Sequence, residues 1–170
     1  MKQGILILGI AVLLVGMATP AQAKKSDMTL GLGLFLGSPL GANMKYRMDD
    51  VHAIDVTMGF GFVGYRNFHI HADYLYHWRV VANKDLDMDL HLGVGPVVEI
   101  YRGTVRFPVT HDETRALFAI RVPIGLDFMI RKVVNRTPID FFIEFAPGLQ
   151  LFDGVWYYFD GGIGFRYYFF

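Results

Sequence analysis

YYFDGGIGFRYYFF, from Tyr157 to Phe170, alternates between two kinds of side chain. Successive side chains of a β-strand point to opposite faces. One face of this strand carries Phe159, Ile163, Phe165, Tyr167 and Phe169, interrupted only by Gly161, and the other carries Asp160, Gly162, Gly164, Arg166 and Tyr168. An aromatic-rich face backed by a charged face is typical of a membrane-spanning strand that has lipid on one side and a polar lumen on the other.

The same alternation recurs in eight segments, and the apolar face of each segment carries no Asp, Glu, Lys, Arg or His. A charged side chain that faces lipid at mid-depth costs about 2–4 kcal/mol. A register slip of one residue would therefore be costly, because it would turn a whole charged face outward. The pattern predicts an all-β fold, an eight-stranded antiparallel transmembrane up-and-down β-barrel. The expected strands are Thr29–Leu36, Leu40–Met48, Ala53–Phe62, Phe68–Val81, Asp87–Tyr101, Ala116–Ile130, Ile139–Leu151 and Tyr157–Phe170.

The N-terminal residues 1–23 have the features of a signal peptide. Lys2 supplies a positive charge, Ile5–Val15 is an apolar run, and Ala21-Gln22-Ala23 is a cleavage site of small residues. The apolar run is shorter than the ~20 residues that a spanning helix needs. We therefore expect one barrel domain over residues 24–170, after removal of the signal peptide; a retained N-terminal helix is the alternative.

Composition excludes several classes of protein. The chain has no cysteine, which excludes a disulfide scaffold, a thiolate metal site, a cysteine nucleophile and a lipid-modified N-terminal cysteine. Its formal net charge is zero, so nothing indicates a nucleic-acid partner.

An even strand number places both ends of the barrel on one side, which we expect to be the periplasm. The longest connection, Arg102–Arg115, then lies outside the cell. Arg131–Pro138 is long for a periplasmic turn, and Pro96 and Pro147 are expected to mark bulges or bends. Aromatic girdles are expected at both rims: Tyr46, Trp78, Tyr167 and Phe169 at the periplasmic rim, and Tyr65, Trp156 and Tyr158 at the outer rim.

Several motifs carry a resemblance that spans the whole mature length: Gly37-Ser38-Pro39-Leu40-Gly41, Ala53-Ile54-Asp55, His71-Ala72-Asp73-Tyr74-Leu75, Arg121-Val122-Pro123-Ile124-Gly125-Leu126 and Gly161–Phe169. The chain resembles the small eight-stranded outer-membrane barrels of the OmpA- and OmpX-like group, and most closely an uncharacterised family of bacterial outer-membrane barrels.

The resemblance implies an integral location in the bacterial outer membrane, with lipid and lipopolysaccharide as surroundings. It also implies that Phe165, Tyr167 and Phe169 form the insertion signal that the barrel assembly machinery reads, whereas Phe170 is an extra residue beyond that pattern. It brings no catalytic or cofactor-binding residues with it.

The inward face is expected to hold a polar network, because the interior of an eight-stranded barrel is just wide enough for its own side chains and buried charges must pair or meet water. Arg166 is expected to bridge carboxylates of its neighbours, with Glu144 and Asp140 supplied by the preceding strand. The alternative is a narrow channel or binding lumen for small polar solutes or ions, which inward glycines would leave room for unless Phe35, Phe142 and Tyr168 cover them. The expected network is Lys45, Arg47, Asp55, His69, His71, Asp73, Arg79, His91, Glu99, Arg121, Asp127, Asp140, Glu144, Asp160 and Arg166.

Three chemical alternatives to this structural interpretation depend on particular residues. His69 and His71 share the inward face, with Asp73, His77 and His91 nearby, and such pairs can bind Zn²⁺ or Cu²⁺, but the spacing specifies no third ligand. Lipid A-modifying barrels rely on serine with histidine, whereas the mature chain offers only Ser26 and Ser38. The Arg102–Arg115 loop could bind a surface partner or lipopolysaccharide phosphates.

A soluble lipocalin-type barrel would alternate too, but it would turn the apolar face inward. Lys45 is the only lysine within the expected strands, which suits lipid surroundings better than a soluble surface. The sequence therefore predicts a monomeric, non-enzymatic barrel protein with no cofactor and no metal, and with a structural or surface-interaction role.

Overall fold

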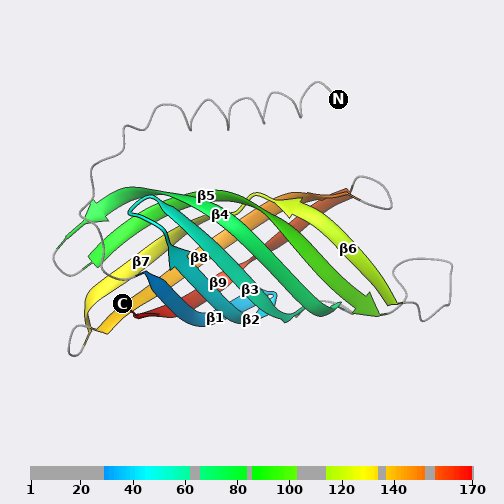
Figure 1. Ribbon diagram of the computed structural model, residues 1–170, viewed down its shortest axis with the longest axis horizontal. Coiled ribbons are helices and arrows are strands. Elements are labelled where there is room, and N and C mark those ends of the chain that lie inside the picture. The colour runs from blue at the N-terminus through cyan, green and yellow to red at the C-terminus, as the bar shows by residue number, and fades with distance from the viewer. Residues whose placement is uncertain are drawn as a thin grey trace, which may run out of the picture.

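The computed structural model describes residues 29–61, 66–83, 86–102, 114–133, 137–151 and 156–169. The expected signal peptide, residues 103–113 of the expected outer loop, and Phe170 lie outside these residues. Figure 1 shows the described strands, tilted around a common axis. No helix among the described residues is long and apolar enough to cross a membrane. The strands are β1 (Leu30–Ser38), β2 (Leu40–Arg47), β3 (His52–Phe60), β4 (Arg66–Ala82), β5 (Leu86–Arg102), β6 (Thr114–Arg121), β7 (Ile124–Val133), β8 (Thr137–Gln150) and β9 (Trp156–Phe169).

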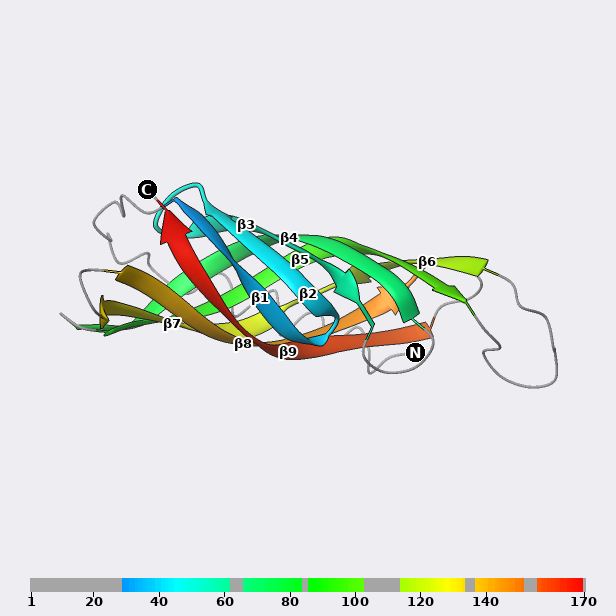
Figure 2. The same cartoon turned by 90° about the horizontal axis from the view of Figure 1, so that it is seen from below.

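The sheet closes on itself because the first strand pairs with the last. β1 runs antiparallel to β9 from the pair Leu30–Phe169 to the pair Ser38–Gly161. Figure 2 shows β1 between β2 and β9. The end at which Leu30 and Phe169 meet is called the terminal end here, and the opposite end is called the far end. Closure leaves no free sheet edge, which is the arrangement that prevents edge-to-edge aggregation.

β6 and β7 are two halves of one strand, so the barrel has the eight strands that the sequence predicts. Both halves pair with β5 on one side and β8 on the other. They keep one register, because Arg121 lies opposite Gly95 and Ile124 lies opposite Leu92. The interruption falls at Val122-Pro123, where the proline has no backbone N–H to donate.

The neighbouring backbone bridges this interruption. Gly93 N donates to Pro123 O at 2.8 Å, and Val122 N donates to Pro147 O at 2.8 Å. The expectation of a bulge or bend at Pro147 is wrong: β8 and β9 hold one register across it, and Pro147 stays paired with Phe159. The expectation of a bulge at Pro96 is wrong: β4 and β5 hold the same register on both sides of it, and Pro96 stays paired with Ile120.

The expected long turn at Arg131–Pro138 is also wrong. β7 continues to Val133 and β8 begins at Thr137, and Val133 pairs with Thr137 after a register shift. Most of the segment is therefore strand, and the connection at the terminal end is as short as such barrels require.

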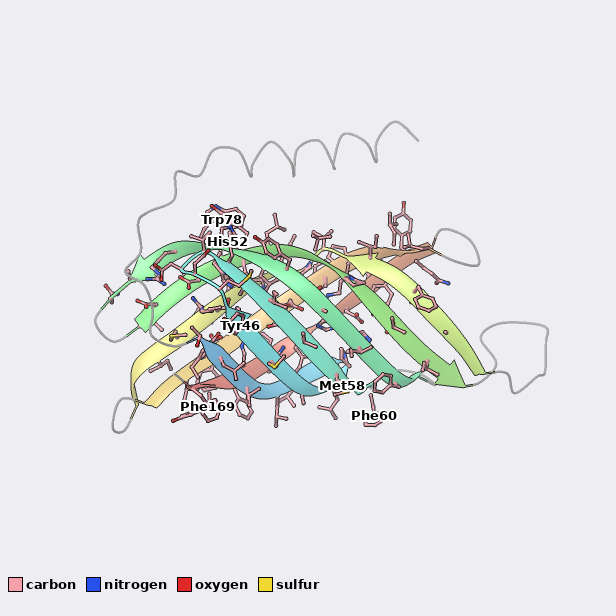
Figure 3. All side chains as sticks on the ribbon, viewed as in Figure 1. Tyr46, His52, Met58, Phe60, Trp78 and Phe169 are labelled. Atoms are coloured by element: carbon pink, nitrogen blue, oxygen red, sulfur yellow. The ribbon has the colours of Figure 1, made fainter. Side chains whose placement is uncertain are left out.

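Side chains divide by face as the alternation predicts. On β8, the Ile143 side chain is 55% exposed whereas Glu144 is 6% exposed. The charged rows line the inside of the barrel and the apolar rows face outward, where Figure 3 shows sticks projecting from the ribbon. The alternative of a barrel with an apolar interior is therefore wrong.

Aromatic residues gather on the outward face near the terminal end. Tyr46, Tyr167 and Phe169 are exposed by 40–46%, and Figure 3 places His52, Trp78 and Phe169 toward that end, with Phe60 farther along the barrel. The side chains of Tyr65 and Trp156 lie outside the described residues. Tyr158 does not belong to an outer girdle, because its side chain is only 3% exposed and points inward; its position in the alternation, next to outward Phe159, accounts for this.

Close contact between β1 and β9 depends on Gly33. A Cβ atom at this position would overlap the carbonyl oxygen of Phe165 in the neighbouring strand. We expect Gly33→Ala to destabilise the barrel by about 1–3 kcal/mol, the usual cost of overpacking, measured as a lower urea midpoint of heat-modifiable gel mobility in detergent. Leu34→Ala, at an outward position on the same strand, is the control; an unchanged midpoint for Gly33→Ala would contradict the tight closure.

Candidate functional site

The charged interior is the candidate site. Fourteen of the fifteen expected network side chains are buried, and the Arg79 side chain, at the terminal end, is 21% exposed. The same interior also holds the buried side chains of Asn43, His77, Asp87, Asp89 and Tyr158. The alternation in the sequence already places Asp87 and Asp89 on the inward face. The strands bring these side chains into three groups that follow one another along the barrel axis.

The central group is built around Asp127 of β7. Lys45 Nζ reaches it from β2, on the opposite wall of the barrel, and donates to Asp127 Oδ2 at 2.7 Å. His91 Nδ1 lies 2.9 Å and His77 Nε2 lies 3.2 Å from the same oxygen. With Arg166 of β9, which contacts the other oxygen, this carboxylate connects five strands, because its contacts come from β2, β4, β5 and β9. The whole group consists of Lys45, Asp55, His77, His91, Asp127, Asp140 and Arg166.

Arg166 of β9 is the other hub of the central group. Its guanidinium contacts Asp55 at 2.5 Å, Asp127 at 2.6 Å and Asp140 at 3.0 Å. The guanidinium carbon lies 3.8 Å from the centroid of the Phe142 ring, a cation–π contact. The expected bridge to Asp140 is present. The expected bridge to Glu144 is wrong, since that carboxylate pairs with a different arginine.

That arginine is Arg121 of β6, in the far-end group. Arg121 NH2 forms an ion pair with Glu144 Oε1 and lies 2.9 Å from Asp73 Oδ2. Arg121 NH1 is 3.7 Å from Asp160 Oδ2 and 3.3 Å from His71 Nδ1. A single guanidinium thus faces three carboxylates and an imidazole. The far-end group consists of His69, His71, Asp73, Glu99, Arg121, Glu144, Tyr158 and Asp160.

Two histidines and a tyrosine complete the far-end group. His69 Nδ1 lies 2.7 Å from Glu99 Oε1, and His69 Nε2 lies 2.8 Å from His71 Nδ1. The Tyr158 hydroxyl, on β9, donates to Glu99 at 2.9 Å and also contacts Asp160. It reaches across the lumen, because β4 and β5 form the opposite wall.

Among the described side chains, the terminal group, at the end where the chain enters and leaves the sheet, pairs two arginines with two aspartates. Arg47 NH1 contacts Asp89 Oδ2 at 3.3 Å, and Arg79 Nε donates to Asp89 Oδ1 at 3.0 Å. Arg79 NH1 lies 4.0 Å from Asp87 Oδ2. Tyr168 lies beside Arg47, with its hydroxyl 3.5 Å from Arg47 Nε.

Aromatic rings cover several inward glycines. A Cβ atom on Gly31 would meet the Tyr168 ring, one on Gly162 would meet the Phe35 ring, and one on Gly164 would meet the Phe142 ring. The glycines therefore accommodate rings rather than leaving an open passage at these points. Together with the ion pairs that join opposite walls, this is the interior of a small barrel filled by its own side chains.

The histidines come together in a way that sequence spacing could not specify. His69, His71 and Asp160 offer ligand atoms within 4.8 Å of one another, as do His77, His91 and Asp127. The third side chain near His69 and His71 thus comes from β9, which is far away in the sequence. A second combination places Asp73 and Glu144 near His71.

Comparison with known proteins supports the architecture alone. No family model matches the chain, and no curated protein matches it. Among solved structures it is similar to the N-terminal β-barrel domain of OprF from Pseudomonas aeruginosa, with a TM-score of 0.52 and 11% sequence identity over 86% of this chain and 100% of that one. At this identity the likeness shows a shared fold: a closed, antiparallel, eight-stranded up-and-down β-barrel.

Proposed function

We propose that this chain is a non-enzymatic integral protein of the bacterial outer membrane, with a structural or surface-interaction role. The observation that carries the proposal is the division of the sheet into an apolar outer face and an interior bridged by ion pairs. The outward rows are apolar along the middle of the described strands, as hydrocarbon surroundings require. Similarity to the β-barrel domain of OprF supports the closed barrel on which the proposal rests.

The contacts across the lumen favour a closed interior over a channel. Lys45 and Asp127 join opposite walls at 2.7 Å in the central group. Tyr158 and Glu99 join distant strands at 2.9 Å in the far-end group. Moving an ion along the axis would require breaking buried, hydrogen-bonded charge pairs, and each broken pair costs several kcal/mol.

The outward face of β9 supports a role for Phe165, Tyr167 and Phe169 in assembly. Each of the three is exposed by 40–42%, and they alternate along the last strand. We propose that the barrel assembly machinery recognises this row during insertion, with both termini in the periplasm and with lipid and lipopolysaccharide as neighbours in the membrane.

Planar-bilayer recording tests the closed interior. We expect the purified protein, inserted into a bilayer, to give no steady single-channel openings, while the same preparation shows heat-modifiable gel mobility and fractionates with the outer membrane. Steady openings that depend on protein concentration would overturn the structural proposal and favour the narrow channel. Recovery in the soluble fraction would overturn the membrane location.

A further inference from the structure

The barrel is not equally tall around its circumference. β1, β2 and β3 have 9, 8 and 9 residues, whereas β4 and β5 have 17 residues each and β8 and β9 have 14 each. With a rise of about 3.3 Å per residue and a tilt of about 40°, β2 has a height of about 20 Å along the axis and β5 a height of about 43 Å. Figure 2 shows the turn between β1 and β2 ending well short of β6 and β9 at the far end.

The apolar rows on the outward face follow the same asymmetry. On β5 the row has seven members at alternate positions, from Met88 to Ile100. On β2 it has five, from Leu40 to Met48 in the turn that follows the strand. At the same rise and tilt the two rows are about 30 Å and about 20 Å tall. Outer-membrane barrels carry an apolar band about 25 Å tall, so the row on β5 spans such a band and the row on β2 does not.

The turn between β2 and β3 fixes one edge of the short side. It carries Asp49, whose side chain is 55% exposed. Asp49 Oδ1 accepts hydrogen bonds from the backbone N–H of Val51 at 2.8 Å and of His52 at 2.7 Å, and the His52 imidazole lies 2.8 Å from Asp49 Oδ2. An exposed charged group of this kind requires water or lipid headgroups, so the hydrocarbon layer beside β2 must end before this turn.

The turn at Ser38-Pro39 fixes the other edge. β1 ends there, opposite Gly161 of β9, and β9 continues beyond this pair to Trp156 with β8 as its partner. The backbone of a turn does not lie exposed in hydrocarbon, because its polar groups would lose the hydrogen bonds that water supplies. Hydrocarbon beside β2 is therefore limited to the stretch between the two turns.

A bilayer of uniform thickness cannot match both sides of such a barrel. A layer tall enough for β5 would bury the Ser38-Pro39 turn, and a layer matched to β2 would leave apolar side chains of β5 in water. Bilayers accommodate a short apolar surface by becoming thinner beside it. The outward face of β1–β3 is continuous with the outward rows of β4 and β9 through backbone pairing, so the same lipid that meets those rows meets the short side.

We propose that the outward face of β1, β2 and β3, here called the thin sector, compresses the bilayer beside it and has lipids of short acyl chains as its preferred neighbours. The proposal rests on the membrane location proposed above and adds a place where the headgroups of the two leaflets approach each other. Leu34, Met44 and Met58, one from each strand of the thin sector, are exposed by 40–50% and would contact the shortened hydrocarbon layer.

Nitroxide labels test the depth of the thin sector. The chain has no cysteine, so Met44→Cys on β2 and Ile143→Cys on β8 each accept a single label at an outward position, 40% and 55% exposed in the unaltered protein. In dioleoylphosphatidylcholine vesicles we expect the label at position 44 to collide more with a water-soluble nickel chelate and the label at position 143 to collide mainly with oxygen. Val94→Cys, at an outward position that is 51% exposed on β5, is the control and should behave as position 143 does.

The length of the lipid distinguishes failure of the thin sector from failure of the membrane location. In dilauroylphosphatidylcholine vesicles the difference between positions 44 and 143 should shrink, because the whole bilayer is then thin. Equal oxygen accessibility at the two positions in the dioleoyl lipid would overturn the thin sector and leave the membrane location intact. Aqueous signals from both labels in both lipids would overturn the membrane location and the thin sector with it.

Lysine substitutions measure the same difference without a label. The cost of a lysine on the lipid face falls toward the headgroups, so Met44→Lys should lower the urea midpoint in dioleoyl vesicles by less than Ile143→Lys does. Insertion of Met44→Lys under conditions in which Ile143→Lys fails to insert is the same result. A midpoint for Met44→Lys as low as that for Ile143→Lys would contradict the proposal.

Discussion

Replacing Arg166 with alanine should lower the free energy of unfolding of the barrel by about 3–5 kcal/mol, the cost of removing one partner from a buried ion pair. Arg166 is 1% exposed and contacts the carboxylates of Asp55, Asp127 and Asp140. Its loss leaves Asp127 with Lys45 and leaves Asp140 with no other arginine or lysine within ion-pair distance among the described residues. Urea unfolding in detergent micelles, followed by heat-modifiable gel mobility, measures the change.

Two further substitutions separate charge from geometry in this prediction. Arg166→Lys keeps the positive charge but loses the fork that reaches several carboxylates at once, so we expect an intermediate loss. Arg79→Ala removes a partly exposed arginine and should cost less than Arg166→Ala, because water reaches the Arg79 side chain. Equal midpoints for the unaltered protein and Arg166→Ala would show that the central group does not stabilise the barrel.

Which side chains face inward could be predicted from the sequence, because a strand has a period of two residues. The inward position of Arg166 and the outward position of Phe165 both follow from that period. The same rule, applied consistently, also places Tyr158 inside. Its assignment to an outer girdle came from its nearness to the end of the strand, and the alternation contradicts it.

The partners of the inward side chains could not be predicted in the same way. Lys45 and Asp127 are far apart in sequence and stand on opposite walls, and their pairing depends on the tilt of the strands and the length of each side chain. Arg166 was expected to reach Glu144 on the adjacent strand. In the sheet Arg166 is paired with Asp140, and Glu144 lies four residues farther along β8. Glu144 instead pairs with Arg121 on its other side, which adjacency in the sheet alone could not decide.

The break at Val122-Pro123 illustrates another limit. Pro96 and Pro147 lie within strands, Pro123 lies at the break between β6 and β7, and each lacks one backbone donor. Which of them interrupts a strand depends on where the missing N–H would have pointed relative to its neighbours. At Pro123 the adjacent residues Gly93 and Pro147 supply the remaining hydrogen bonds, a compensation that exists only in the assembled sheet.

Replacing Ile143 with lysine should impair insertion into lipid by about 2–4 kcal/mol, the cost of a positive charge on the lipid face near the bilayer midplane. Ile143 lies in the middle of β8, is 55% exposed, and pairs with Leu126 and Ile163, both on the outward face. Folding yield from urea into lipid vesicles, and the reversible unfolding curve in those vesicles, measure the effect.

Tyr157→Lys provides the matched control for Ile143→Lys. Tyr157 is 84% exposed and is the second residue of β9, so it lies at the far end, where a charge costs about 0–1 kcal/mol. If the outward face meets hydrocarbon, the free-energy costs of the two lysine substitutions differ strongly in lipid vesicles. They differ little in detergent micelles, because only the bilayer fixes the depth at which each lysine lies. A spin label at position 143 should then report acyl chains. Equal costs for both lysines in vesicles, or an aqueous signal from that label, would mean that the apolar rows meet something other than lipid and that the membrane location is wrong.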